Sequence, residues 1–318
     1  MSTAGIHPPR PAHWAHLGES TFVLGIWLLF WIHRLLGRWP FRLCLYPVVV
    51  FYWISNPQLR AASLQYLQRL QAATGALGRA PSRSDSLRHV ALFGETMLDK
   101  LLAVSGRYQQ AAVRLENSQH VKPGGVIVTA HMGCLELCRS MAEKYTIVGG
   151  NKVKLNILVH TRHAEQFNRV LKRLNPQNDF RLIEVSQISP ATAILLAEKI
   201  AAGEYVVIAG DRIPVVAGRT VGVDFLGHAA QLPIGPYVLA ALLKCPLYLL
   251  GCIHENSGYA IHFEVLADKV ELPRRHRDQA IAAYAALYVT AITALLKRSP
   301  YDWFNFFPFW DQANATTK

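Results

Sequence analysis

The pattern of apolar and polar positions predicts a strand followed closely by a helix near the middle of the chain. Gly125–Thr129 is an apolar run of Val, Ile and Thr that begins at a glycine, which is typical of a buried strand. From Gly133 to Tyr145 apolar residues recur at helical spacing. His131 therefore stands where the strand ends and the helix begins.

The same alternation of element types continues toward the C-terminus. Further predicted strands are Lys154–His160, Arg181–Val185, Tyr205–Ala209, Leu247–Glu255 and Tyr259–Leu266. Predicted helices are Ala164–Leu174, Pro190–Ala202, Gly235–Lys244 and Arg277–Lys297. Residues 58–116 are predicted to be helical, with helices at Leu59–Ala72 and Leu87–Ser105. This alternation predicts an α/β fold with a mainly parallel sheet flanked by helices.

Two apolar runs, Phe22–Ile32 and Leu43–Ile54, precede that domain, and a basic segment with Arg34, Arg38 and Arg42 separates them. Each run is shorter than the ~18–20 residues that cross a bilayer unaided. The runs fit a helical hairpin in one leaflet, helices lying along the membrane interface, or core helices of the domain. Tryptophans beside arginines favour the interface. We therefore expect residues 1–57 to be a tail with membrane-associating helices and residues 58–318 to be a single α/β domain.

Composition and charge narrow the class of partner. Of 318 residues, 51% are hydrophobic and only 17% are charged, with a formal net charge of +12. This charge favours an anionic partner, and the apolar character favours a lipid surface over nucleic acid, since no basic run with interleaved aromatics of the RNA-binding type is present. The five cysteines form no CxxC pair, which predicts reduced thiols in a reducing compartment.

The spacing of His131 and Glu136 suggests acid–base chemistry. Two side chains five residues apart on one helix point in different directions, so they meet only if His131 precedes the helix. A carboxylate at that place would fix the imidazole tautomer and raise its basicity, and amides of the first helical turn would favour an anion. The spacing equally fits a surface histidine and a glutamate that is favourable in a first turn. A zinc site with Cys134 and Cys138 would lack a fourth ligand, so no metal and no cofactor are expected.

A second pair of polar residues, Asp211 and Arg212, follows the predicted strand Tyr205–Ala209. If this strand lies parallel to Gly125–Thr129, Arg212 and His131 lie at the same edge of the sheet, where ligands of open α/β sheets bind. Arg212 would then offer a planar cation to a phosphate or carboxylate, or alternatively pair with Asp211 or a nearby acid. Asp224 is expected to be a solvated turn residue.

Several short blocks occur in a characteristic order. They are His131-x4-Glu136, Gly210-Asp211-Arg212, Phe225-Leu226-Gly227, Pro233-Ile234-Gly235-Pro236 leading to Cys245-Pro246-Leu247-Tyr248, and Ser299-Pro300-Tyr301-Asp302-Trp303-Phe304-Asn305-Phe306-Phe307. The set resembles the lysophospholipid acyltransferase superfamily, in particular its bacterial branch of lipid A late acyltransferases. The resemblance runs from about residue 13, at His13-Trp14-Ala15, to about residue 311.

The resemblance implies transfer of a fatty acyl group from acyl carrier protein or coenzyme A to a hydroxyl or amine of a lipid acceptor. It also implies a location at the cell inner membrane, with the catalytic domain on the cytoplasmic side. His131 would be the general base held by Glu136, and the substrate-binding positions would be Gly133, Asp211, Arg212, Phe225 and Gly227. Cys134-Leu135 stands where lipid A enzymes usually have Asn-Trp, which leaves another glycolipid, an aminoacyl lipid or a polyene-type lipid open as acceptor. A thioesterase or lipid hydrolase, or a non-catalytic lipid-binding protein, are the alternative functions.

Overall fold

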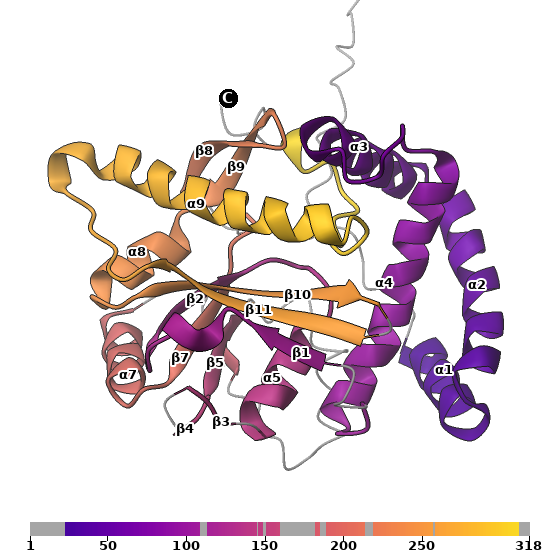
Figure 1. The fold of residues 1–318 in the computed structure, drawn as a ribbon, viewed down its shortest axis with the longest axis horizontal. Helices are drawn as coiled ribbons and strands as arrows, with labels where there is room; N and C mark the ends of the chain where they lie inside the picture. The colour runs from indigo at the N-terminus through magenta and orange to yellow at the C-terminus, as the bar shows by residue number, and fades with distance from the viewer. Residues whose placement is uncertain are drawn as a thin grey trace, which may run out of the picture.

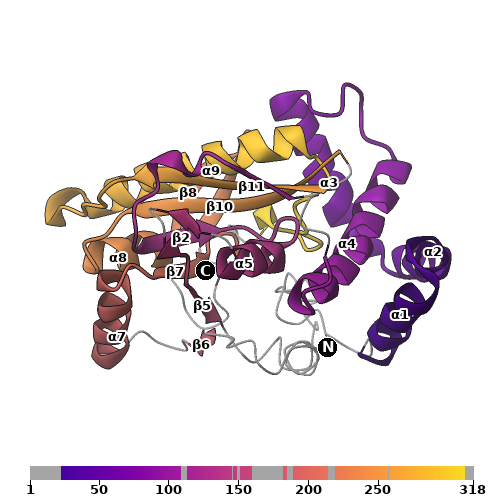
Figure 2. The same ribbon diagram turned by 60° about the horizontal axis from the view of Figure 1, so that its bottom comes forward.

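The computed structural model describes residues 23–108, 113–144, 146–148, 151–159, 182–184, 189–213, 219–256 and 258–311. Its main feature is a seven-stranded sheet, in the order β1-β11-β10-β2-β7-β5-β6, with helices on both faces (Figures 1 and 2). In that order the strands are β1 (Val113–Glu116), β11 (Gly258–Ala267), β10 (Leu247–Glu255), β2 (Gly125–Thr129), β7 (Tyr205–Ala209), β5 (Leu155–Val159) and β6 (Leu182–Glu184). Neighbours are parallel except β10 and β11, so the predicted α/β fold with a mainly parallel sheet is confirmed.

The helices fall into an N-terminal group and a group that covers the sheet. The first group is α1 (Val23–Leu36), α2 (Arg38–Ser55), α3 (Pro57–Thr74) and α4 (Arg83–Val104). The second is α5 (Leu135–Lys144), α7 (Pro190–Ala201), α8 (Gly235–Leu242) and α9 (Arg277–Arg298), with short 3-10 helices η3 (Ser118–His120) and η5 (Arg274–His276). Two antiparallel pairs lie outside the main sheet: β3 (Thr146–Val148) with β4 (Asn151–Lys152), and β8 (Thr220–Phe225) with β9 (His228–Pro233).

Strand β2 lies at the centre of the sheet and is buried along its whole length. Val126 and Val128 point into the core cluster that includes α8 and α9, while Ile127 points into the cluster that includes α5. Figure 2 shows α9 and α5 on opposite faces of the sheet. A parallel strand that is buried on both faces has to be apolar at every position, which explains why it reads as a continuous apolar run.

Two of the sequence predictions need correction. Val113–Glu116, predicted to be helical, is the edge strand β1, paired in parallel with β11. Its four residues are too few to show a period, and a partner 146 residues away in register (Val113 opposite Tyr259) decides its conformation. Residues 220–233, for which no strand was predicted, form the β8–β9 hairpin. The predicted helix Ala164–Leu174 and the residues before Val23 lie outside the described part of the chain.

Both N-terminal apolar runs form helices, and one face of α2 packs against the domain. Phe41, Leu45 and Val49 of α2 are buried, and Leu45 and Val49 lie close to Gly94 of α4. Large apolar side chains are nevertheless exposed along α1 and α2: Leu28, Trp31, Leu35, Leu36, Trp39, Leu43, Tyr46, Val48, Phe51, Tyr52 and Ile54. These helices are thus only half covered by protein.

By length and composition, one helical segment in the described part could cross a membrane, the 25-residue stretch Arg274–Arg298. One face of it, however, carries residues buried in the main core, among them Tyr288, Ile292 and Leu296. It therefore serves here as the helix that covers the sheet.

Candidate functional site

Strands β2 and β7 place two polar residues side by side at one edge of the sheet. The two strands are parallel, with Thr129 opposite Ala209, and the Gly210 N–H donates to the Thr129 carbonyl at 2.8 Å. The chain therefore leaves both strands in the same direction, and His131 and Asp211 follow as neighbours. The sequence prediction of a shared edge is confirmed.

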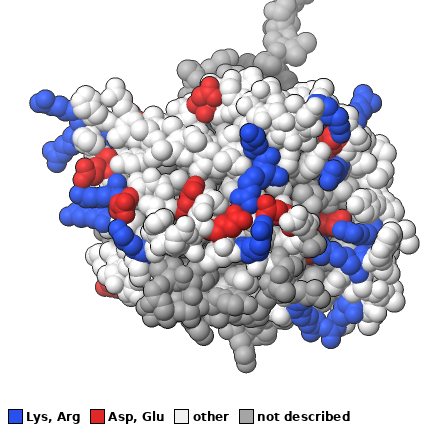
Figure 3. Space-filling view, in the orientation of Figure 1, with Lys and Arg blue, Asp and Glu red and all other residues white. Residues whose placement is uncertain are grey.

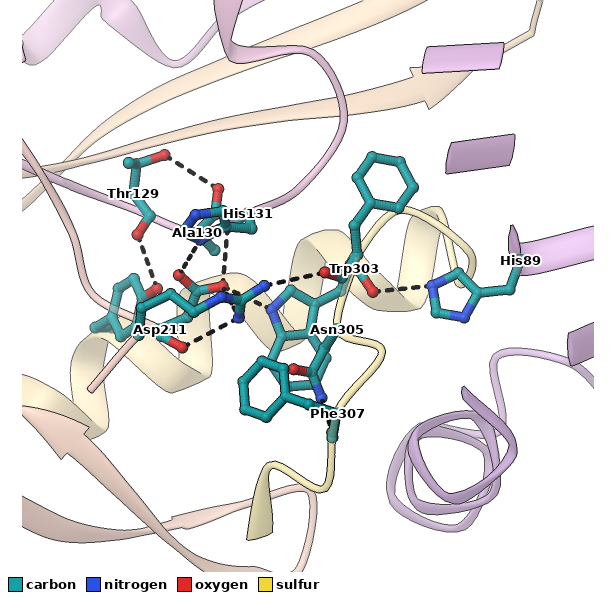
Figure 4. A network of polar contacts seen from close by, with 11 residues as sticks. His89, Thr129, Ala130, His131, Asp211, Trp303, Asn305 and Phe307 are labelled. Carbon is teal, nitrogen blue, oxygen red and sulfur yellow. Dashed lines mark hydrogen bonds and ion pairs between the residues drawn. The ribbon is translucent and has the colours of Figure 1, made fainter. Parts of the chain in front are cut away.

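Asp211 holds the imidazole of His131 (Figure 4). His131 Nδ1 lies 2.8 Å from Asp211 Oδ1, and the His131 backbone N–H donates to Asp211 Oδ2 at 2.9 Å. An ionised carboxylate only accepts hydrogen bonds, so Nδ1 carries the proton and Nε2 presents a lone pair. The His131 side chain is 49% exposed, so a substrate can approach the ring. The pair thus has the geometry of an oriented general base.

Glu136, which was predicted to orient His131, has other partners in the structure. Its Oε1 lies 3.5 Å from Lys100 Nζ of α4, and the Cys134 thiol donates to its Oε2 at 3.9 Å. The first turn of α5 directs this carboxylate toward α4, whereas Nδ1 of His131 is directed toward β7. The structure therefore assigns the orienting role to Asp211 in place of Glu136.

The Asp211 carboxylate is 1% exposed and is surrounded by donors. Besides His131, the Trp303 indole N–H donates to Oδ2 at 2.9 Å, and Arg212 Nη1 lies 3.3 Å from the same oxygen. Burial would raise the pKa of Asp211, but the charge that His131 carries when protonated at low pH, the charge of Arg212 and the hydrogen bonds from His131 hold it well below its ordinary value. Asp211 therefore stays ionised at neutral pH.

Arg212 is directed toward protein groups, in agreement with the ion-pair alternative. Its Nη2 donates to the Phe304 carbonyl at 3.0 Å, and its guanidinium lies over the Phe307 ring, 4.8 Å from the centroid. Only 12% of its side chain is exposed. Arg212 thus neutralises Asp211 and ties it to the C-terminal loop, and does not offer an open fork to a substrate anion.

The loop after α9 closes over the turn that carries His131. The Phe304 N–H donates to the His131 carbonyl at 2.9 Å, and the Gly133 N–H donates to the Asp302 carbonyl at 3.0 Å. Gly133 was predicted to bind substrate, but its amide is occupied by this hydrogen bond. Gly133 has φ +51°, and a Cβ there would lie 2.1 Å from the Cys252 carbonyl oxygen, so only glycine fits this turn.

Trp303 is itself fixed by buried neighbours. Its carbonyl lies 2.9 Å from His89 Nε2, and His89 Nδ1 lies 3.0 Å from Ser63 Oγ. Because a carbonyl only accepts, Nε2 carries the proton and Nδ1 accepts from Ser63. Burial lowers the pKa of His89 to about 4, so this histidine is neutral at pH 7. The Tyr66 ring packs edge-on against Trp303 at 5.0 Å between centroids.

Phe225 and Gly227, the other predicted substrate-binding residues, differ in their surroundings, since one is buried and the other is exposed. Phe225 is 1% exposed and packs edge-on against Trp303, with 5.3 Å between ring centroids. Gly227 lies at the exposed tip of the β8–β9 hairpin, where its N–H donates to Asp224 Oδ1 at 2.9 Å. Phe225 therefore packs against the Trp303 ring and helps to hold it in position. Asp224 is exposed, as predicted, but it is a residue of strand β8 next to the hairpin turn and not a turn residue.

The charges around His131 favour a neutral imidazole. Burial among neighbouring protein atoms lowers the pKa of His131, as does the positive charge of Arg212, while Asp211 opposes the shift and Lys100 adds to it. For Lys100, burial would lower the pKa, but Glu136 and its other neighbours hold it above the ordinary value. At pH 7 Nε2 of His131 therefore carries a lone pair, and Lys100 carries a positive charge.

The cysteines near this site are thiols. Burial raises the pKa of Cys134 and of Cys252 well above the ordinary value, so neither offers a thiolate to a metal. Among the residues that the structure describes, no group of three or more His, Cys, Asp and Glu side chains is placed to hold a metal ion.

In comparisons with known proteins, no family model matches this chain, and no curated protein matches its sequence.

Proposed function

We propose that this chain is a membrane-associated acyltransferase that moves a fatty acyl group from a thioester carrier to a hydroxyl or amine of a lipid acceptor. The observation that carries the proposal is the His131–Asp211 pair, with Nδ1 held at 2.8 Å and the ring half exposed. The ordered blocks that resemble the lysophospholipid acyltransferases supply the reaction class. The carrier is acyl carrier protein or coenzyme A.

In the proposed reaction, Nε2 of His131 removes the proton from the acceptor hydroxyl or amine as that group attacks the thioester carbonyl carbon. Asp211 stabilises the imidazolium that forms. The new bond gives a tetrahedral oxyanion. When this collapses, the carbon–sulfur bond breaks, and the proton on His131 passes to the departing thiolate. A positioned base of this kind contributes about 10²–10⁴-fold to a rate.

The developing oxyanion needs positive charge close to His131. The first turn of α5 presents backbone N–H groups that have no partner within the helix. Lys100 of α4 adds a full positive charge, and its Nζ lies 3.5 Å from Oε1 of Glu136 in the first turn of α5. We assign Glu136 the role of fixing the Lys100 ammonium. Gly133, Asp211, Arg212 and Phe225 are positioning residues for the base under this proposal.

The exposed apolar face of α1 and α2 supports association with a membrane. Trp31 and Trp39 are 47% and 80% exposed, and the Arg34 guanidinium lies over the Trp31 ring at 5.4 Å. In Figure 3 basic side chains lie at the right-hand edge of the molecule, over α2 and α4, with a few acidic side chains and much uncharged surface beside them. This mixture suits the headgroup region of an anionic bilayer. The reduced cysteines fit the cytoplasmic side of the inner membrane.

Lipid mass spectrometry tests the proposal. Lipids would be extracted from cells that express the wild-type chain, the His131→Ala variant, or neither. A lipid species heavier by one acyl group in the wild-type sample alone is the expected result, and its mass names acceptor and chain length together. Free fatty acid without any acylated lipid would instead favour a thioesterase. Identical lipids in all samples would overturn the proposal.

A further inference from the structure

A cavity of about 390 Å³ lies where the end of α2 meets the beginnings of α3 and α4. This size is within the range of small-ligand pockets. It is separate from the His131 site, and its lining includes Trp53, Ile54, Arg60, Ala61, Arg83 and Ser86. The lining is largely apolar, with two guanidinium groups. It therefore suits a ligand with an anionic part and an apolar part.

Arg60 is held in a fixed orientation beside this cavity. Its Nη1 donates to the carbonyls of Trp53 and Ile54 at the end of α2, and its guanidinium lies over the Trp53 ring at 5.3 Å. The Trp53 indole N–H in turn donates to Ser86 Oγ at 3.1 Å. Among the described residues its hydrogen-bond partners are carbonyls, which do not neutralise its charge, so the cation is preorganised for an anion.

Arg83, the first residue of α4, adds a second cation to the lining. The acid nearest in sequence, Asp85, is directed elsewhere, since it accepts from Arg79 at 2.7 and 2.8 Å and from Tyr301 at 2.8 Å. Within the described part of the chain, no carboxylate forms a salt bridge with Arg60 or Arg83. Two arginines without a carboxylate partner, set in an apolar wall, bind a phosphate more strongly than they bind a neutral ligand.

The apolar side of the cavity continues onto the exposed face of α2. Ile54 lines the cavity and is 61% exposed, and Phe51, one turn before it, is 70% exposed. A ligand whose phosphate sits between the arginines could thus lay its hydrocarbon chains along α2. Among soluble anions and lipids, an anionic phospholipid has both of these parts.

We propose that this cavity binds the phosphate headgroup of an anionic phospholipid and anchors the chain at the membrane surface. The proposal rests on the membrane association proposed above, but not on the acyl-transfer chemistry. The headgroup site would fix the orientation of α2 on the bilayer, and the acyl chains of the bound phospholipid would lie beside Phe51 and Ile54. It adds a specific lipid contact to the general attraction between a basic protein and an anionic surface.

Vesicle flotation with the purified full chain tests the site. The probes are vesicles of phosphatidylcholine alone and of phosphatidylcholine with phosphatidylglycerol. Arg83→Gln should weaken binding to the phosphatidylglycerol vesicles about fivefold, the effect of removing one cation near an anionic surface. Ala61→Trp, which fills the cavity from an exposed helix position without changing charge, should weaken it at least as much. Arg275→Gln, which removes an exposed arginine in η5, is the matched control and should bind like wild type.

The outcomes separate the cavity from the wider proposal. If Ala61→Trp binds like wild type, or if Arg275→Gln loses as much as Arg83→Gln, the headgroup site is overturned and only a diffuse electrostatic attraction remains. If the wild-type chain binds neither kind of vesicle, membrane association itself is wrong. Thermal melting of the same preparations should give the wild-type midpoint for Ala61→Trp, which shows that the variant is folded independently of any acyl transfer.

Discussion

The indole N–H of Trp303 donates to Oδ2 of Asp211 at 2.9 Å, although the two residues are 92 positions apart. The other oxygen of Asp211, Oδ1, accepts from the His131 imidazole. The imidazole is therefore positioned by a residue at the end of the neighbouring strand, which is in turn positioned by the loop after the last helix. Three distant parts of the chain must fold together before the imidazole is in place.

Replacing Trp303 with Phe should lower acyl transfer at pH 7 by about tenfold, while the aromatic packing is kept. The loss of one hydrogen-bond donor to a buried carboxylate costs about 1.5–3 kcal/mol. Part of this free energy raises the activation barrier, because Asp211 then orients His131 less firmly. With one hydrogen-bond donor fewer, the Asp211 carboxylate attracts the imidazolium more strongly, so the pKa of His131 should rise and the acidic limb of the pH–rate profile should move to higher pH. Kinetics of the purified chain over a pH series measures both.

Trp310 offers a matched control, because its indole N–H donates to the Phe225 carbonyl within the same aromatic cluster. Trp310→Phe should leave the pH–rate profile in place. An equal shift in both variants would mean that Trp303 acts only through packing.

Asp211→Asn and Glu136→Gln distinguish the orienting carboxylate seen in the structure from the one expected from the sequence. Asp211→Asn should reduce kcat/KM by about 10²–10⁴-fold, since the tautomer is no longer fixed. It should also cost about 3–5 kcal/mol of unfolding free energy, because Arg212 loses its buried partner. Glu136→Gln should have a much smaller effect on both, since its pairing with Lys100 is partly exposed. Urea unfolding and steady-state kinetics give the two quantities. Equal activity losses in the two variants, with the same shift of the acidic limb of the pH–rate profile, would restore the orienting role to Glu136.

The free energy of unfolding should fall as the pH is lowered from about 6.5 to about 4, because of His89. The folded-state pKa of His89 is about 4, below its ordinary 6.5, so the unfolded chain takes up a proton first in this interval. The contribution of neutral His89 to the free energy of unfolding is fully present above pH 6.5, where it amounts to about 3 kcal/mol. His89→Gln keeps a donor for the Trp303 carbonyl but cannot titrate. Its stability should depend less steeply on pH in denaturant titrations, and an unchanged slope would exclude His89 as the source.

Gly133→Ala should destabilise the chain and abolish acyl transfer. A Cβ at this position would meet the Cys252 carbonyl oxygen at 2.1 Å, so overpacking of about 1–3 kcal/mol adds to the left-handed strain. Gly227, with φ +76° and no atom within 4 Å of an added Cβ, is the control for strain alone. Thermal melting should show a small loss for Gly227→Ala, roughly 1–2 kcal/mol, and a clearly larger one for Gly133→Ala. Similar losses would mean that the turn has room to relax.

Local sequence patterns were enough to predict the sheet edge that carries the site. The strand at Gly125–Thr129 and the strand at Tyr205–Ala209 are both uninterrupted apolar runs, and each is followed by a polar residue. Parallel pairing, which alternation of strands and helices predicts, then brings His131 and Asp211 together.

The partner of His131 could not be chosen in this way. Glu136 is the acid that lies nearest to His131 along the chain. Asp211 is 80 residues away, but it contacts the imidazole because β2 and β7 are neighbours in register. The aromatic block around Trp303 was visible in the sequence, but nothing local distinguishes an indole that hydrogen-bonds a carboxylate from one that fills the core. Lys100 was missed because its role depends on how α4 packs against α5.

The most direct test of the central claim is acyl transfer by the purified full chain, with wild type compared with His131→Gln. A radiolabelled thioester donor and membrane lipid extract as acceptor would be used, and folding of the variant would be checked by thermal melting. The proposed role of Nε2 predicts that His131→Gln stays folded and loses at least about 10²-fold in transfer rate. A folded His131→Gln protein that transfers acyl groups at the wild-type rate would contradict it.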